Sequence, residues 1–141
     1  MKGLPIAGWQ MRYTGYNGRI IYKFQAQQPM SNELQIIDLV IGEGKAAVKG
    51  ALIKTHYTGW LDNGTQFDSS HTRNQPFQTV IGTGRVIKGW DQGIIGMQVG
   101  GKRKLIVPAH LGYGERSMGS LIPANSNLTF EIELLEVLVR D

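Results

Sequence analysis

The stretch LTFEIELLEVL, residues 128–138, carries the clearest structural signal in this chain. In its first seven residues, apolar side chains alternate with Thr or Glu. Such alternation gives an extended strand one apolar face and one polar face. The alternation breaks at LLEVL, which predicts a bulge or a change of facing after Leu134. This stretch therefore predicts a half-buried strand of a sheet.

Further apolar runs, each bounded by turn residues, predict the other strands of this sheet. They are residues 34–42, 51–61, 66–70, 76–82 and 104–108. The second run ends at the turn residues DNGT, and the last runs into Pro108, where a central strand must end or reach an edge. With 19 glycines, the chain favours turns and short strands over a helical bundle.

Only GWDQGIIGM, residues 89–97, has helical spacing, with Trp90, Ile94 and Met97 on one face. Gly93 and Gly96 each cost about 1 kcal/mol relative to Ala, so this helix needs tertiary packing. Gly89 is expected to let the chain turn so that the Trp90 ring lies flat. These elements predict an α+β fold, a mostly antiparallel sheet with one short helix on its concave face.

Charge and composition indicate a boundary near residue 32. Residues 1–32 contain four basic side chains and no acid, whereas residues 33–141 carry 11 basic and 11 acidic ones. In the first segment, Asn17-Gly18 lies between MRYTGY and RIIYKF, which predicts a β-hairpin arm. Because MSNELQ at Met30 reads like a natural beginning, residues 1–32 could instead be a start-site artefact. A neutral domain over 33–141 argues against nucleic-acid binding.

Several functions are excluded or disfavoured. The chain has no cysteine, which excludes disulfides and thiolate metal sites, and its three histidines lack metal-ligand spacing. Ser69 and Ser70 have no nucleophile elbow around them, and IGTGRVIKG lacks the third glycine of a dinucleotide site. No apolar run is long enough to cross a membrane. We therefore expect a cytoplasmic protein that needs no cofactor or metal.

Six short motifs occur in order: HYTG (56–59), FDSS (67–70), PF (76–77), VIKGW (86–90), GYGE (112–115) and LIP (121–123). Followed by LTFEIELLEV, this set closely resembles the FKBP family of peptidyl-prolyl cis-trans isomerases. The resemblance covers Glu33 to Asp141, about three-quarters of the chain. It implies a twisted antiparallel sheet of five or six strands wrapped around one short helix.

The resemblance also implies a hydrophobic pocket with Trp90 as its floor. It implies catalytic roles for Tyr57, Phe67, Asp68, Trp90 and Tyr113, and substrate or macrolide binding by Phe77, Val86, Ile87, Leu121, Ile122 and Phe130. The backbone N–H of Ile87 and the hydroxyl of Tyr113 would hold carbonyl oxygens. Asp68 could act on catalysis directly, or it could hold a turn through Ser69 or Ser70, or pair with Tyr57 and a nearby Arg.

The implied reaction is rotation about Xaa-Pro peptide bonds, which assists protein folding and needs no nucleophile because no covalent bond is made or broken. Expected partners are proline-containing peptides, unfolded protein clients and macrolides such as tacrolimus or rapamycin, but neither nucleic acid nor membranes.

The chain is expected to be a monomer unless the arm mediates association. A proline-binding module without turnover and an assembly role for the arm are the alternatives. Met118 departs from the residue types common at its loop position, which leaves substrate preference open.

Overall fold

The computed structural model describes residues 11–16, 19–24 and 32–139. The chain divides into two units, Met1–Asn32 and Glu33–Asp141. In the first unit, β1 (Met11–Tyr16) pairs antiparallel with β2 (Arg19–Phe24), and Tyr16 lies opposite Arg19. This pairing is the one that a hairpin arm requires. The predicted Asn17-Gly18 turn itself lies outside the described residues.

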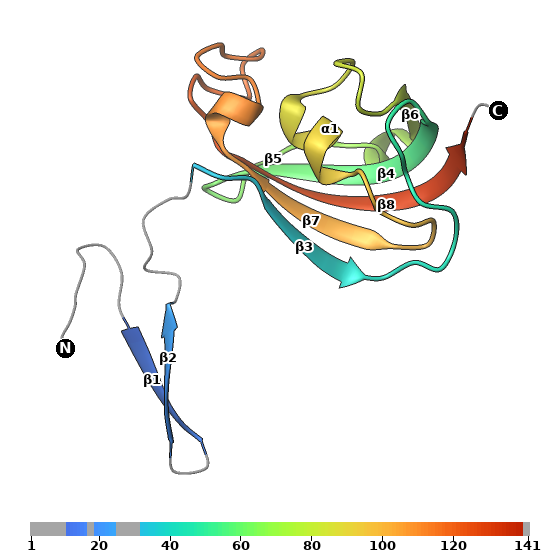
Figure 1. Cartoon of the computed structure of the whole chain (residues 1–141). Helices are drawn as coiled ribbons and strands as arrows, with labels where there is room; N and C mark the ends of the chain where they lie inside the picture. The colour runs from blue at the N-terminus through green and yellow to red at the C-terminus, as the bar shows by residue number, and fades with distance from the viewer. Residues whose placement is uncertain (1–10, 17–18, 25–31, 140–141) are drawn as a thin grey trace. The chain divides into compact units, whose positions relative to one another are not determined.

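The second unit is an antiparallel six-stranded sheet, as the sequence predicts (Figure 1). Its strands are β3 (Gln35–Val40), β4 (Leu52–Leu61), β5 (Gln66–Ser69), β6 (Phe77–Val80), β7 (Lys102–Val107) and β8 (Leu128–Leu138). The order across the sheet is β3-β7-β8-β4-β5, and β6 also pairs with β4. Because β5 and β6 share one edge of β4, the segment between them forms part of the rim of the sheet.

Strand β8 supplies much of the core. Leu128, Ile132 and Leu134 are fully buried, in the alternation that the sequence shows. The register with β4 then shifts: Thr55 faces Leu134, but Lys54 faces Glu136. This shift is the predicted bulge, and it moves the buried position to Val137.

The single α-helix among the described residues, α1 (Lys88–Gly93), is shorter than predicted. It ends because the chain turns at Gly96, whose φ is +91° and whose N–H donates to the Ala47 carbonyl. The expected role of Gly89 is also wrong: its φ is not positive, and an added Cβ would lie 2.6 Å from Val107 Cγ1. At Gly93 the corresponding distance to Leu105 Cδ2 is 2.7 Å. Both glycines therefore let α1 lie close to β7, on the concave face of the sheet (Figure 1).

Two 3-10 turns complete the unit, η1 (His71–Arg73) after β5 and η2 (Ala109–Leu111) after β7. Among the described helices, none is both long and apolar enough to cross a membrane.

Candidate functional site

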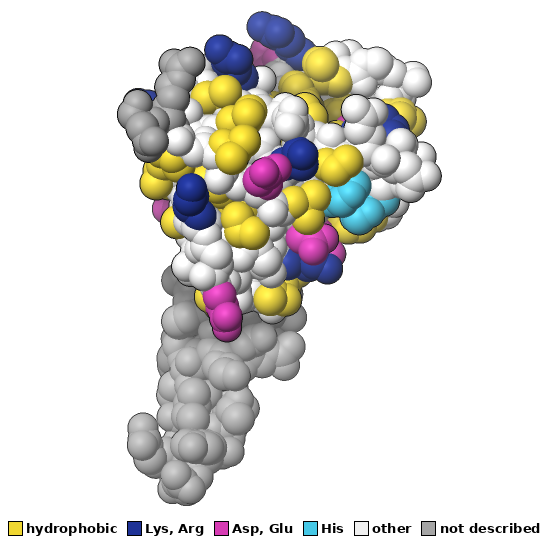
Figure 2. All heavy atoms as spheres, turned by 90° about the vertical axis from the view of Figure 1, so that its right-hand side faces the viewer, with side chains coloured by type: hydrophobic (Ala, Val, Ile, Leu, Met, Phe, Trp, Pro, Cys, Tyr) yellow, Lys and Arg dark blue, Asp and Glu magenta, His cyan; other side chains and the backbone are white. Residues whose placement is uncertain are grey.

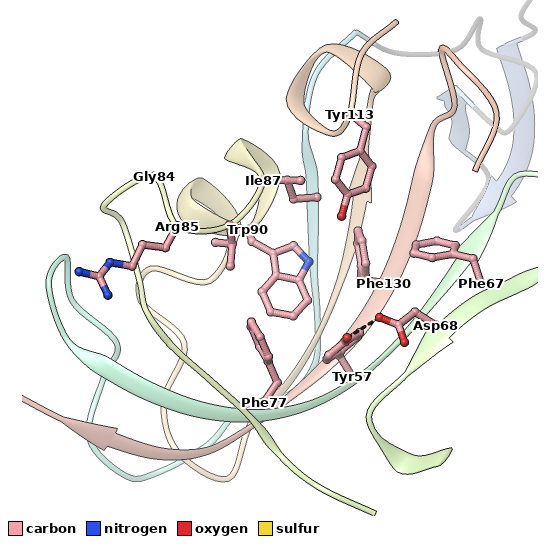
Figure 3. A pocket seen from close by; sticks show the side chains of 11 residues that line it. Tyr57, Phe67, Asp68, Phe77, Gly84, Arg85, Ile87, Trp90, Tyr113 and Phe130 are labelled. Carbon is pink, nitrogen blue, oxygen red and sulfur yellow. Dashed lines mark hydrogen bonds between the residues drawn. The ribbon is translucent and has the colours of Figure 1, made fainter. Parts of the chain in front are cut away.

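A pocket of about 470 Å³ opens between α1 and the concave face of the sheet (Figure 3). Its lining comes from β4, β5, β6, α1, β8 and two loops. The eleven lining residues are Tyr57, Phe67, Asp68, Phe77, Gly84, Arg85, Val86, Ile87, Trp90, Tyr113 and Phe130. Nine of these are residues that the sequence predicts for the site.

Aromatic rings form the floor and inner walls of the pocket. Trp90 is only 4% exposed and meets three rings edge to face: Tyr57 at 5.1 Å, Phe77 at 5.8 Å and Phe130 at 5.5 Å between centroids. Edge-to-face packing suits the quadrupoles of aromatic rings. Trp90 is thus both a core residue and the floor of the pocket.

The indole nitrogen of Trp90 is a buried donor with no hydrogen-bond partner among the described residues. Figure 3 shows this nitrogen on the side of the ring that faces Ile87 and Tyr113. A buried Trp N–H usually finds a partner in the protein. The pocket therefore keeps an unsatisfied donor in its floor.

Gly59 on β4 makes room for two of the wall aromatics. A Cβ at this position would lie 2.6 Å from Phe67 Cζ and 2.9 Å from Phe130 Cε1, inside contact distance. The two rings pack edge to face with centroids 5.7 Å apart. The glycine of the HYTG motif is therefore required for close approach, a role that the sequence alone does not show.

One side of the pocket mouth, here called the carboxylate side, consists of Tyr57, Asp68 and Arg73. The Tyr57 hydroxyl donates to Asp68 Oδ2 at 2.5 Å, and Arg73 donates to Asp68 Oδ1 at 2.6 Å and to the Tyr57 hydroxyl at 2.9 Å. Of the three expectations for Asp68, the structure places it in a pair with Tyr57 and a nearby Arg. Arg73 lies in η1, five residues beyond Asp68.

These contacts shift the pKa values on the carboxylate side in opposite directions. Burial alone would raise the pKa of Asp68, but hydrogen bonds from Tyr57 and Arg73 outweigh burial and hold it below the ordinary value. Burial, together with the hydrogen bond to Asp68, raises the pKa of Tyr57. Asp68 is therefore ionised and Tyr57 neutral at neutral pH.

The two serines of the FDSS motif anchor this side to β4. Ser70 Oγ accepts a hydrogen bond from the Tyr57 backbone N–H at 2.8 Å, and Ser69 Oγ lies 2.9 Å from Thr58 Oγ1. Ser70 is fully buried. The serines thus fix the backbone that carries the Tyr57 ring, and Asp68 itself also forms a hydrogen bond with the Ser69 backbone.

The opposite side of the mouth, here called the loop side, is residues 82–87. Gly82 and Gly84 both have positive φ, and their N–H groups donate to the two carboxylate oxygens of Asp91 at 2.7 and 2.8 Å. Asp91 lies in α1, so the helix holds the loop directly. The sequence alone does not indicate this role of Asp91.

Two residues that line the pocket, Ile87 and Tyr113, each carry a hydrogen-bond donor that has no partner among the described residues. Ile87 is the N-cap residue of α1. Its carbonyl oxygen accepts hydrogen bonds from the Trp90 and Asp91 N–H groups, whereas its own N–H takes no part in the hydrogen bonds of the helix. Tyr113 is half-buried, and Figure 3 shows its hydroxyl directed into the pocket. Burial, and then the charge of Asp68, raises the pKa of Tyr113, so its hydroxyl keeps its proton at neutral pH.

The structure does not bring Leu121 and Ile122 to the pocket lining. Met118 and Ile122 exchange two backbone hydrogen bonds, at 2.8 and 3.2 Å, which fold their loop back on itself. As a result, Ile122 is buried in the core and Leu121 is 52% exposed. Gly84 and Arg85 take part in the lining instead. Their place directly before the predicted Val86-Ile87 wall is the one sequence signal for them.

No group of three or more His, Asp or Glu side chains in the described part of the chain is placed to hold a metal ion.

Comparison with known proteins identifies the family of this chain. Residues 43–135 match the family model described as FKBP-type peptidyl-prolyl cis-trans isomerase. The chain belongs to this family. It is an FKBP-type isomerase that catalyses cis-trans interconversion of peptidyl-prolyl bonds. Residues 1–42 precede the matched range, so β3 belongs to the sheet of this FKBP domain but not to the match.

Individual relatives agree with this assignment. A protein of Neisseria meningitidis named "FK506-binding protein" is 58% identical over 104 residues, which cover 74% of this chain and 95% of the relative. Human "Peptidyl-prolyl cis-trans isomerase FKBP2" is 56% identical over 89 residues, 63% of each protein. The crystal structure of AtFKBP13 superposes with a TM-score of 0.69 at 49% identity and covers 73% of this chain and 91% of that one.

Proposed function

We propose that this isomerase binds the prolyl ring of its substrate over Trp90 and twists the preceding peptide bond within the pocket. The Ile87 N–H and the Tyr113 hydroxyl hold the carbonyl oxygens on either side of the ring. The observation that carries this proposal is the combination of an aromatic floor with these two donors, which no described residue engages. Orientation by few polar groups in an apolar cavity is typical of small-ligand sites.

The pocket suits this reaction because the barrier is electronic. Rotation about an Xaa-Pro bond faces roughly 18–20 kcal/mol, since twisting destroys amide resonance. The planar amide is the more charge-separated form, and an aromatic pocket solvates it less well than water does. Lowering the barrier by about 4–7 kcal/mol gives roughly 10³–10⁵-fold acceleration.

The carboxylate side keeps the pocket walls in place during this rotation. Asp68 and Arg73 neutralise each other and hold the Tyr57 hydroxyl, so the ring of Tyr57 stays edge-on to Trp90. We propose that Asp68 acts on catalysis chiefly through Tyr57. Phe67, Phe77, Val86 and Phe130 supply the apolar walls. Leu121 and Ile122 keep a predicted role only if their loop rearranges when substrate binds.

Macrolides are the second class of ligand that we propose for the pocket. Relatives at 58% and 57% identity carry the name "FK506-binding protein". A macrolide with a ring of prolyl shape and adjacent carbonyls would use the same floor and the same two donors. Tacrolimus or rapamycin should therefore compete with peptide substrates.

A peptide isomerase assay with the full chain tests the site. We expect catalysis of a short Xaa-Pro peptide, competitive inhibition by rapamycin, and a kcat/KM about 3–10-fold lower for Tyr113→Phe, which loses one hydrogen bond. Met118→Leu, in the same loop but outside the pocket lining, serves as control and should match the wild type. If Tyr113→Phe also matches the wild type, the assignment of its hydroxyl is wrong.

The wider biological role rests on the isomerase activity. We propose that the protein accelerates proline-limited folding of unfolded clients as a cytoplasmic monomer, and that residues 1–32 are dispensable for catalysis. Removing residues 1–29 separates this proposal from an assembly role of the arm. A change in oligomeric state with unchanged turnover would favour assembly, and fractionation of cells would test the location.

A further inference from the structure

Arg85 lies between two hollows of the molecular surface. It lines the isomerase pocket, and it also lines a second hollow of about 480 Å³ with Gly50, Leu52, Val80, Leu138 and Val139. Figure 3 shows that its guanidinium group points away from Trp90, out of the aromatic part of the pocket. Figure 2 shows apolar side chains gathered among charged ones on the end of the domain where β8 finishes. A peptide that leaves the pocket over the loop side therefore passes the Arg85 side chain.

The guanidinium of Arg85 is free to meet a charge on the substrate. Among the described residues, none forms a hydrogen bond or an ion pair with this side chain. Asp91, the acid that holds the loop, has both carboxylate oxygens engaged by the Gly82 and Gly84 N–H groups. Arg85 is thus a charged, exposed side chain on a loop whose backbone is held in place.

Two further cationic residues, Lys49 and Lys88, adjoin the loop. The side-chain stem of Lys49 packs beneath Gly82, where a Cβ would lie 2.9 Å from Lys49 Cγ, and Lys88 is exposed at the start of α1. On the opposite side of the mouth, the Asp68 charge is already compensated by Arg73. Residues 82–88 therefore carry two cations, Arg85 and Lys88, and no acid, and Asp91 is the acid that holds the loop.

We propose that Arg85 is a specificity-determining residue that favours substrates with an acidic residue adjacent to the proline, on the side where the peptide crosses residues 82–87. The proposal rests on the isomerase activity and concerns only the choice among substrates. An adjacent residue lies about 3.3–3.6 Å along an extended chain, within reach of a long guanidinium side chain. Because the pair is exposed, its effect is modest and sensitive to salt.

Two series of short peptides test the proposal, one with Glu, Gln or Lys before the proline and one with the same residues after it. For the wild type at low salt, we expect kcat/KM for the Glu peptide to exceed that for the Lys peptide by about 3–10-fold in one series. The ratio should approach one at about 1 M NaCl, where the screening length is about 3 Å. In Arg85→Gln the ratio should be close to one, and in Arg85→Glu it should be inverted.

Lys45→Glu provides the matched control, because Lys45 is exposed and lines neither hollow. It makes the same change in net charge and should keep the wild-type ratio. The proposal is overturned if neither series shows a preference, if both Arg85 variants keep the wild-type ratio, or if Lys45→Glu shifts the ratio equally. Turnover of the Gln peptide by the wild type reports the isomerase activity separately, so a failure of that activity is distinguishable.

Discussion

The carboxylate side and the loop side of the pocket mouth are held in opposite ways. On the carboxylate side, Asp68 and Arg73 form an ion pair and both contact the Tyr57 hydroxyl. The two charges therefore hold the ring of Tyr57 in position. On the loop side, Asp91 accepts from the Gly82 and Gly84 N–H groups, and no residue in the described part of the chain pairs with Arg85. The comparison indicates that the two sides have different roles. The carboxylate side fixes the pocket walls around the rotating peptide bond, and the loop side presents the charge of Arg85 to the substrate residues that flank the proline.

Both sides depend on the floor that they share, so the largest effect is expected from Trp90→Ala. Removing a buried aromatic ring should cost about 3–5 kcal/mol of unfolding free energy. Tyr57, Phe77 and Phe130 would each lose an edge-to-face partner. We expect macrolide affinity, corrected for the folded fraction, to fall by more than about tenfold as well.

Denaturant titration and calorimetric binding of rapamycin measure the two losses separately. Trp60→Ala is the control, because it removes the same type of side chain from β4, outside the pocket lining. Equal effects of the two substitutions on binding would show that Trp90 is a core residue without a role as floor.

The next effect concerns the carboxylate side. Asp68→Asn keeps the size of the side chain but removes the charge that Arg73 and the Tyr57 hydroxyl contact. We expect kcat/KM to fall about tenfold, equivalent to about 1.4 kcal/mol of transition-state stabilisation, with little change for a neutral peptide between low and high salt.

Asp38→Asn gives a matched control, because Asp38 also pairs with an arginine, Arg103 at 2.7 Å, but at the opposite edge of the sheet. It should leave kcat/KM within about twofold of the wild type. A wild-type rate for Asp68→Asn would mean that Tyr57 needs no carboxylate to keep its position.

A smaller effect is expected from loosening the loop side. Asp91→Asn replaces one of the two oxygens that accept from Gly82 and Gly84, and it removes the charge from both contacts. Charge-assisted hydrogen bonds contribute about 1.5–3 kcal/mol each, and part of this remains with the amide oxygen. We expect about 1–2 kcal/mol lower stability and a KM that rises about threefold with kcat nearly unchanged.

Kinetics across a substrate series separate KM from kcat, and hydrogen exchange of the Gly82 and Gly84 amides reports the loop directly. Asp62→Asn, on a different turn, is the comparison variant. If kcat falls and KM stays constant, the loop side contributes to rotation of the peptide bond, and the proposed difference in role between the two sides is wrong.

The sequence predicts the scaffold of this site better than its rim. Alternation over 128–134 predicts β8 because a half-buried strand needs that pattern, and the family motifs point to nine residues that line the pocket. The end of α1 depends on a non-local contact from Gly96 to Ala47, which no local pattern encodes.

The rim depends on contacts of the same non-local kind. Arg85 lines the pocket because Asp91 holds residues 82–84. Ile122 does not line the pocket, because its backbone hydrogen bonds to Met118 fold the loop back on itself. Sequence motifs identify residue types suited to a pocket, whereas loop geometry decides which residues reach it.

The smallest expected effect is the contribution of the carboxylate side to stability as a function of pH. Because the pKa of Asp68 in the folded protein lies below its ordinary value of 3.8, its ionised form stabilises the fold. This contribution is fully present above pH 3.8 and is lost as pH falls through the lower pKa of the folded state. The Asp68 side chain is 35% exposed and its ion pair is open to solvent, so we expect a contribution of less than about 1 kcal/mol to the unfolding free energy.

Subtracting the unfolding free energy of Asp68→Asn from that of the wild type between about pH 2 and 7 isolates this contribution. A difference that instead grows as the solution becomes acidic would mean that Asp68 is held in its protonated form, and that Arg73 does not compensate its charge.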